Sequence, residues 1–165
     1  MGRSRPWTSR AFVHTLFREW KQWGERPACY SGAMTRNLLT YAAAFIALAL
    51  LDFLWLGVIA RSWYRDGIGH LMASTPSWGA AAAFYLLYPI GLLIFAVLPS
   101  NGDAFRALTL GALFGLFCYG TYDLTGLAVL RDWPLPLTFI DIAWGGVVSA
   151  AGASAGAWVQ RWLAA

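Results

Sequence analysis

The chain has 165 residues, of which 59% are hydrophobic and only 12% are charged. A water-soluble domain carries about 25% charged residues, so this composition excludes an ordinary soluble domain and favours a single membrane domain. The net charge is +4, and seven of the twelve Lys and Arg residues lie in the first 36 positions. Such a basic stretch is typical of a cytoplasmic flank attracted to anionic membrane lipid, and without a recognisable binding fold it does not indicate nucleic acid.

Residues 1–35 are predicted to form a basic, amphipathic segment ahead of the membrane domain. Apolar side chains recur at helical spacing from Phe12 to Trp23, while Arg18 and Lys21 fall elsewhere. The pattern suits a helix that lies on the cytoplasmic headgroups, and a disordered tail explains it equally well. No short apolar core with a cleavage site follows the charges, so we expect no cleaved signal peptide.

Residues 36–165 contain long apolar runs, at Leu39–Ala60, Trp78–Leu98, Ala107–Leu130 and Thr138–Val159. Each run is long enough to cross a hydrocarbon core of about 30 Å at a rise of about 1.5 Å per residue. The sequence therefore predicts an all-α bundle of four transmembrane helices, with Pro89 kinking the second. Nine Lys and Arg residues lie on the inner side and three on the outer side if both termini are cytoplasmic, and the positive-inside rule favours that orientation.

Small residues mark faces on which helices can pack closely. The third run contains Gly111 and Gly115 as a G-x-x-x-G, and the fourth has a row of small side chains at Gly145, Ser149, Gly152 and Gly156. Such residues let helix backbones approach each other. The same faces could serve packing within the chain, a homo-oligomer, or a partner in a larger membrane complex.

Three of the six Asp residues lie inside the apolar runs, at Asp52, Asp123 and Asp141. Each opposes insertion by about 2.5–3.5 kcal/mol near a helix centre, so their presence needs an explanation. From the rise of a helix, they lie about 12, 10 and 5 Å from the outer ends of their helices. The topology thus predicts that all three lie in the outer leaflet at compatible heights.

The neighbours of these carboxylates extend the candidate site. Tyr119 and Tyr122 are expected on the same helix face as Asp123, by their spacing of three and four residues. Arg61 and Arg65 lie one turn apart beyond the first run and could fold back over the carboxylates. A structural explanation competes, in which buried Asp residues cap helices, bind Tyr hydroxyls, or pair with Arg to lock the bundle. No metal site is predicted, because His70 is the only histidine near the carboxylates.

Two short strings have the same spacing, Leu51-Asp52-Phe53-Leu54-Trp55-Leu56-Gly57 and Ile140-Asp141-Ile142-Ala143-Trp144-Gly145-Gly146. Because the helices that carry them run in opposite directions, the strings could reflect an inverted repeat. The match is short, and chance is the better explanation.

Several motifs in a fixed order resemble a bacterial membrane-protein family catalogued as domain of unknown function 2177. They are the string at 51–57, Phe84-Tyr85-Leu86-Leu87-Tyr88, Tyr119-Gly120-Thr121-Tyr122-Asp123-Leu124-Thr125, Trp133-Pro134-Leu135, and Asp141-Ile142-Ala143-Trp144-Gly145. The resemblance covers about residues 36–155 and implies a small helical protein of the bacterial inner (plasma) membrane, with no established activity. The family pattern reads Asp-Leu-Thr-Asn where this chain has Gly126 after Thr125, which weakens any function that depends on that Asn.

Three functions fit these observations. The first is a protein whose carboxylate and tyrosine site in the outer leaflet binds a small ligand, an ion or a proton. The second is an accessory or structural subunit of a larger membrane complex. The third is a small membrane enzyme acting on a lipid or isoprenoid, with Asp side chains as acid and base. The sequence argues against an enzyme because it has no nucleophile motif or phosphate loop, and it defines no cofactor.

Overall fold

A computed structural model of the chain describes residues 28–164, and all regular elements within this range are helices. The predicted amphipathic helix from Phe12 to Trp23 lies outside the described residues and stays a prediction. The chain divides after Thr35, so the helix arrangement given below is that of the unit Arg36–Ala165.

Four helical segments are long and apolar enough to cross a membrane, at Gly32–Ile59, Trp78–Ser100, Ala104–Val129 and Leu135–Trp162. Each contains most or all of one predicted apolar run. The prediction of an all-α membrane protein with four spans is therefore confirmed. Which end of the bundle faces the cytoplasm stays a prediction.

The first span ends in an irregular turn. Helix α2 (Ala28–Leu54) runs directly into a π-helical turn, Trp55–Ile59, which is followed by the short helix α3 (Arg61–Ile68) and a 3₁₀ turn, Gly69–Leu71. The backbone N–H of Ala60 closes the π-helical turn by donating to the carbonyl of Trp55 at 2.8 Å. Such turns widen a helix by one residue and are frequent at functional sites.

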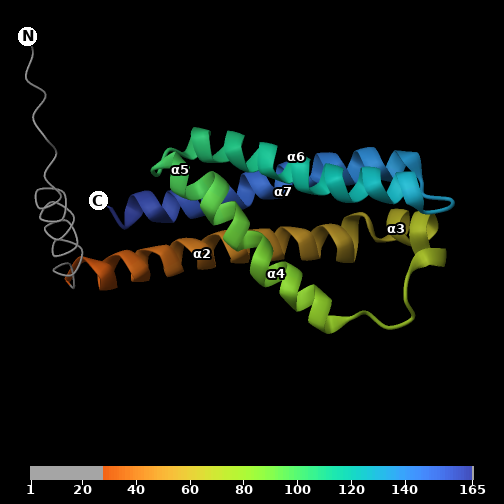
Figure 1. Ribbon diagram of the computed structural model, residues 1–165, viewed down its shortest axis with the longest axis horizontal. Coiled ribbons are helices and arrows are strands. Elements are labelled where there is room, and N and C mark those ends of the chain that lie inside the picture. The colour runs from red at the N-terminus through yellow and green to blue at the C-terminus, as the bar shows by residue number, and fades with distance from the viewer. Residues whose placement is uncertain (1–27, 165) are drawn as a thin grey trace, which may run out of the picture. The chain divides into compact units, whose positions relative to one another are not determined.

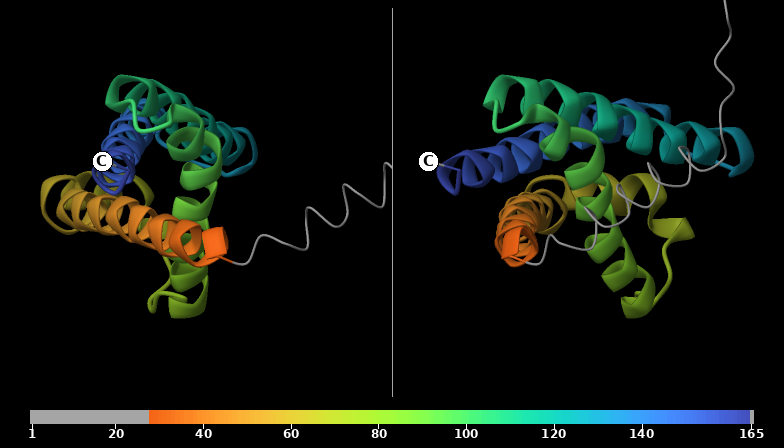
Figure 2. Two further views of the ribbon diagram at one scale, coloured as in Figure 1. Left: turned by 90° about the vertical axis from the view of Figure 1, so that its left-hand side faces the viewer. Right: turned by 60° about the vertical axis from the view of Figure 1, so that its left-hand side comes forward.

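The second span is built from α4 (Trp78–Leu92), a π-helical turn (Leu93–Val97) and α5 (Leu98–Ser100). The buried Pro89 lies inside α4 and removes one backbone donor, and the π-helical turn begins four residues later. Figure 1 shows α4 crossing the other long helices obliquely, and both views in Figure 2 show the same crossing. After α5, left-handed backbone at Asn101 (φ 53°) and Gly102 (φ 80°) reverses the chain.

Helices α6 (Ala104–Val129) and α7 (Leu135–Trp162) form an antiparallel pair that packs along its length (Figure 1). The apolar stretch of α7 is 44% buried, against 22% or less in the other three spans, so α7 is the central helix of the bundle. Buried apolar side chains from all four spans form one core, which includes Leu48, Leu92, Val97, Ala107 and Val148.

Glycines allow the close contact between α6 and α7. A Cβ added at Gly115 would lie 2.0 Å from the carbonyl oxygen of Gly145, and one at Gly111 would lie 2.6 Å from Cβ of Ala153. No larger residue fits at these separations. These faces are therefore occupied within the chain, and a homo-oligomer or complex formed through Gly-rich faces stays a prediction.

Many large apolar side chains point outward from the spans, among them Phe53, Phe95, Phe117 and Phe139. Apolar surface of this extent marks a membrane-facing protein. Polar side chains that are buried inside such a bundle therefore need partners of their own, and they identify the candidate site.

Candidate functional site

The three predicted carboxylates are all buried. Asp52 on α2, Asp123 on α6 and Asp141 on α7 are 3%, 1% and 7% exposed. Because burial of a charged or polar group is costly without partners, the surroundings of each carboxylate decide what it can do.

Asp52 has a donor for each of its oxygens. The hydroxyl of Tyr85 on α4 donates to Oδ2 at 2.8 Å, and the indole Nε1 of Trp144 on α7 donates to Oδ1 at 3.0 Å. Hydrogen bonds to an ionised carboxylate are stronger than those between neutral groups. Asp52 therefore links α2 to α4 and α7.

Asp141 accepts a hydrogen bond from a residue that lies outside the membrane spans. The hydroxyl of Tyr64, on α3, donates to Oδ1 of Asp141, and the same hydroxyl accepts from Nε1 of Trp55 at 3.4 Å. Burial raises the pKa of Tyr64, and its hydrogen bond to Asp141 raises this pKa further. Tyr64 therefore stays neutral over a wide range of pH and connects α3 to the start of α7.

Asp123 has no donor among residues 28–164. Within this range, both of its carboxyl oxygens are buried without a hydrogen-bond partner. The carboxyl of Asp141 is a neighbour of Asp123. Ionised carboxylates only accept hydrogen bonds, so a bond between these two forms only when one of them carries a proton.

No cation from the chain neutralises this pair among the residues that the structure describes. Arg61 and Arg65 are exposed on α3, and within residues 28–164 no salt bridge joins either to Asp123 or Asp141. Their place over the carboxylates stays a prediction. The described residues also contain no group of three His, Cys, Asp or Glu side chains that could hold a metal ion.

The two predicted tyrosines of α6 lie on different faces. Tyr119 is half-buried, and its ring packs on α7 where a Cβ at Gly145 would lie 2.2 Å from the ring. Tyr122 is 61% exposed and packs edge-on against Trp133 at 5.9 Å. Neighbouring helix positions point about 100° apart, so Tyr122 turns away while Asp123 points inward. Its membership of the site stays a prediction.

Gly126, the position at which the chain departs from the expected family pattern, is covered by an indole. A Cβ added there would lie 3.1 Å from the ring of Trp133, whose Nε1 donates to the Thr138 hydroxyl at 3.0 Å. A larger residue at Gly126 would require this ring to shift.

Three side chains that hold the carboxylates were not assigned to the site from sequence, namely Tyr64, Tyr85 and Trp144. A signal for one of them was present, because Asp52 and Asp141 are each followed by a Trp three residues later. These indoles, Trp55 and Trp144, stack face to face at 4.3 Å with an interplanar angle of 6°. Trp144 then binds Asp52, while Trp55 binds the hydroxyl that holds Asp141.

The cavity nearest α3 is apolar. A cavity of about 260 Å³ lies between α3 and the start of α7, lined by Trp63, Gly67, Pro134, Pro136, Leu137 and Ile140. These side chains offer no charged or hydroxyl ligand to an ion. The polar contact between α3 and the carboxyl pair is thus the Tyr64 hydroxyl.

A comparison with protein families gives one match. A family described as "Predicted membrane protein (DUF2177)" matches residues 37–158, a range that includes all three buried carboxylates. The resemblance read from the sequence motifs is thereby confirmed. No curated protein and no solved structure matches the chain.

Proposed function

Since this chain belongs to the DUF2177 family of predicted membrane proteins, we propose a function suited to a membrane interior: the paired carboxyls of Asp123 and Asp141 bind a proton. The observation that carries the proposal is Asp123, a side chain 1% exposed whose oxygens have no donor among the described residues and whose neighbour is a second carboxyl. We place the protein in the inner (plasma) membrane, with this site in the outer leaflet.

The charge of the two carboxyls supports proton binding by the pair. Two adjacent ionised carboxylates in a medium of low dielectric repel each other strongly, and each also loses its hydration. A proton shared between them removes one negative charge and supplies the missing donor in the same step. Ionisable residues inside membrane spans commonly form proton relays, which fits this arrangement.

Tyr64 offers a connection from the pair to the membrane surface. It lies on α3, beyond the first span, and its hydroxyl contacts Asp141 directly. A hydroxyl both donates and accepts hydrogen bonds, so it can pass a proton between water and Asp141. In this proposal Asp141 exchanges the proton and Asp123 stabilises it.

A cation at the pair is the closest alternative, and it is an outcome of the test below. The roles as an accessory subunit and as a lipid or isoprenoid enzyme stay predictions, since no side-chain arrangement described above favours either.

Proton uptake by the purified protein tests the proposal. Detergent-solubilised wild-type protein and Asp123→Asn are titrated from alkaline to mildly acidic pH in weakly buffered solution. We expect the wild type to take up about one proton more than the variant near neutral pH, because a lone carboxyl at Asp141 has no charged neighbour to share a proton with. Equal uptake by the two proteins would refute the proposal.

Asp66→Asn serves as the matched control, because Asp66 is an exposed carboxyl on α3. Its loss should leave the uptake near neutral pH equal to that of the wild type. Adding Na⁺ or K⁺ to the wild type should leave the uptake near neutral pH unchanged. Release of the proton by one of these cations would instead assign the pair to that cation.

A further inference from the structure

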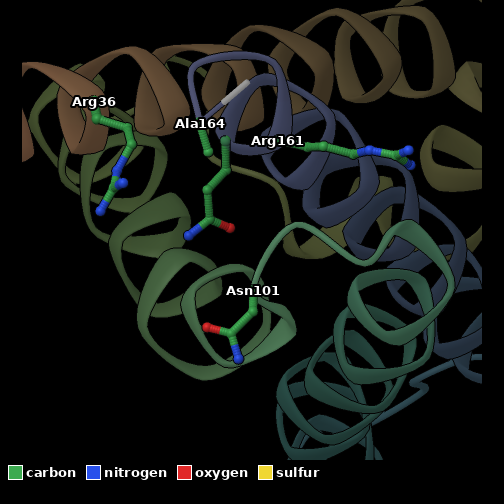
Figure 3. A pocket seen from close by; sticks show the side chains of 5 residues that line it. Arg36, Asn101, Arg161 and Ala164 are labelled. Atoms are coloured by element: carbon green, nitrogen blue, oxygen red, sulfur yellow. The ribbon is translucent and has the colours of Figure 1, made fainter.

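A second polar feature lies at the other end of the bundle, where α2 begins its span and α7 ends. A cavity of about 410 Å³ opens there, lined by Arg36, Asn101, Gln160, Arg161 and Ala164. Figure 3 shows that these residues come from α2, from the turn between α5 and α6, and from the last turns of α7. The cavity is thus formed by three separate parts of the chain.

The lining of this cavity is basic and rich in donors. Arg36 and Arg161 each provide a guanidinium, and the amides of Asn101 and Gln160 add further donors. The two arginine side chains extend in different directions, and that of Arg161 points away from Arg36 and Asn101 (Figure 3). None of the five lining residues is acidic. Guanidinium groups bind phosphate oxygens through several hydrogen bonds at once.

The nearest acidic side chain on these elements is already engaged. Asp103 caps α6, where its Oδ1 accepts from the backbone N–H of Arg106 at 3.0 Å. Its charge is therefore directed at the first turn of α6, where the helix dipole is positive.

The turn that carries Asn101 is held in place by its backbone. Asn101 and Gly102 are both in the left-handed region, and a Cβ added at Gly102 would lie 3.2 Å from Cβ of Arg161. The turn thus packs against the end of α7. Beside it, Oε1 of Gln160 is buried and has no donor among the residues that the structure describes.

The depth of the cavity corresponds to the lipid headgroups. Its lining residues lie at or just beyond the ends of three membrane spans. Trp158 and Trp162, on the last turns of α7, are 67% and 70% exposed. Exposed Trp side chains near span ends are typical of the membrane–water interface. The phosphate of a membrane lipid is an anionic group found at this depth.

We propose that this cavity binds the phosphate of an anionic phospholipid headgroup, with Arg36 and Arg161 as its charged ligands. The site is independent of the carboxyl pair at the opposite end. Asn101 and Gln160 donate to the remaining phosphate oxygens or to a headgroup hydroxyl.

The test is native mass spectrometry of the delipidated full chain, titrated with phosphatidylglycerol, phosphatidylcholine or inorganic phosphate. We expect the wild type to retain phosphatidylglycerol in preference to phosphatidylcholine. The double variant Arg36→Gln/Arg161→Gln should bind phosphatidylglycerol about thirtyfold more weakly, from about fivefold for each lost charge. The charge-retaining variant Arg36→Lys/Arg161→Lys, melting at the wild-type temperature, should keep most of the binding.

Arg106→Gln is the matched control, because Arg106 is exposed near the same end and does not line the cavity. It should bind phosphatidylglycerol like the wild type. Equal weakening in this control would show general surface attraction and would overturn the proposal. Unchanged binding by the double Gln variant, or Arg-dependent binding of inorganic phosphate without binding of phosphatidylglycerol, would overturn it as well.

Discussion

Asp52 and Asp123 are equally buried in the same bundle, yet they have opposite surroundings. Each oxygen of Asp52 accepts a hydrogen bond from a side chain of another helix, whereas neither oxygen of Asp123 has a donor among the described residues. The partners of Asp52 replace the water that burial removes. The polar group beside Asp123 is instead another carboxyl, which supplies a donor only when one of the two carries a proton.

The comparison separates a carboxylate with structural partners from the one to which the proposal assigns a function. The structural explanation offered from sequence, in which buried Asp residues bind Tyr hydroxyls, describes the contacts of Asp52. It leaves Asp123 without an explanation, because a buried acceptor with no donor costs stability and holds nothing together. The predictions that follow test this distinction, from the largest expected effect to the smallest.

The carboxyl pair should come apart if α6 and α7 are forced apart. In Gly115→Ala, the new Cβ would meet the carbonyl oxygen of Gly145 at 2.0 Å, which is backbone and cannot rotate away. We expect a loss of about 3 kcal/mol in the free energy of unfolding, measured by denaturant titration in detergent. Gly120→Ala is the control on the same helix, because no heavy atom outside the helix backbone lies within 4 Å of its new Cβ. It should be neutral or gain up to about 1 kcal/mol from helix propensity. Equal losses in both variants would refute the packing account.

The two carboxylates should respond in opposite ways to the same isosteric change. Asp52→Asn leaves Tyr85 and Trp144 with a weaker acceptor and places an NH₂ group among donors, so we expect a loss of about 2 kcal/mol in unfolding free energy. Asp123→Asn gives Asp141 a permanent donor that needs no bound proton, so stability should stay equal or rise by about 1 kcal/mol. Thermal unfolding of both variants at neutral pH measures the difference. If Asp123→Asn lost as much unfolding free energy as Asp52→Asn, the two carboxylates would have the same structural role and the distinction between them would be refuted.

Tyr64→Phe should give a smaller effect with a distinctive pH dependence. It removes the hydrogen bond to Asp141 and should cost about 1.5 kcal/mol near neutral pH. The pKa of Tyr64 is raised in the folded chain from its ordinary value of 10.0. Above pH 10 the unfolded chain loses this proton while the folded chain keeps it, so this stabilisation is complete below pH 10 and declines at higher pH.

Indole fluorescence checks that prediction, because Trp55 binds the Tyr64 hydroxyl and packs edge-on against Trp63 at 5.9 Å. Melting temperatures followed by this signal should fall more steeply above pH 10 in the wild type than in Tyr64→Phe. Identical pH profiles would mean that the hydroxyl contributes nothing to the docking of α3.

The spans and the three Asp positions were predictable because both depend on residue type along the chain. A run of apolar residues predicts a membrane span even when the rotation of the helix about its axis is unknown. A carboxyl inside such a run is recognisable from the sequence alone, because charged residues are rare in membrane spans. Helix rotation was not predictable, and it decides that Tyr122 faces outward while the adjacent Asp123 faces inward. The partners of Asp52 come from α4 and α7, distant in sequence, so spacing could not reveal them. The π-helical turn at Trp55–Ile59 was also not predictable, because its residues are part of a continuous apolar run.

Infrared difference spectroscopy of the carboxylic acid carbonyl band tests the central claim most directly, because an ionised carboxylate lacks this band. At neutral pH the wild-type protein should show a protonated buried carboxyl. The band should disappear in Asp123→Asn and in Asp141→Asn, and it should remain in Asp52→Asn. A wild-type spectrum without the band at neutral pH, or a band lost only in Asp52→Asn, would contradict the assignment of the proton to the Asp123–Asp141 pair.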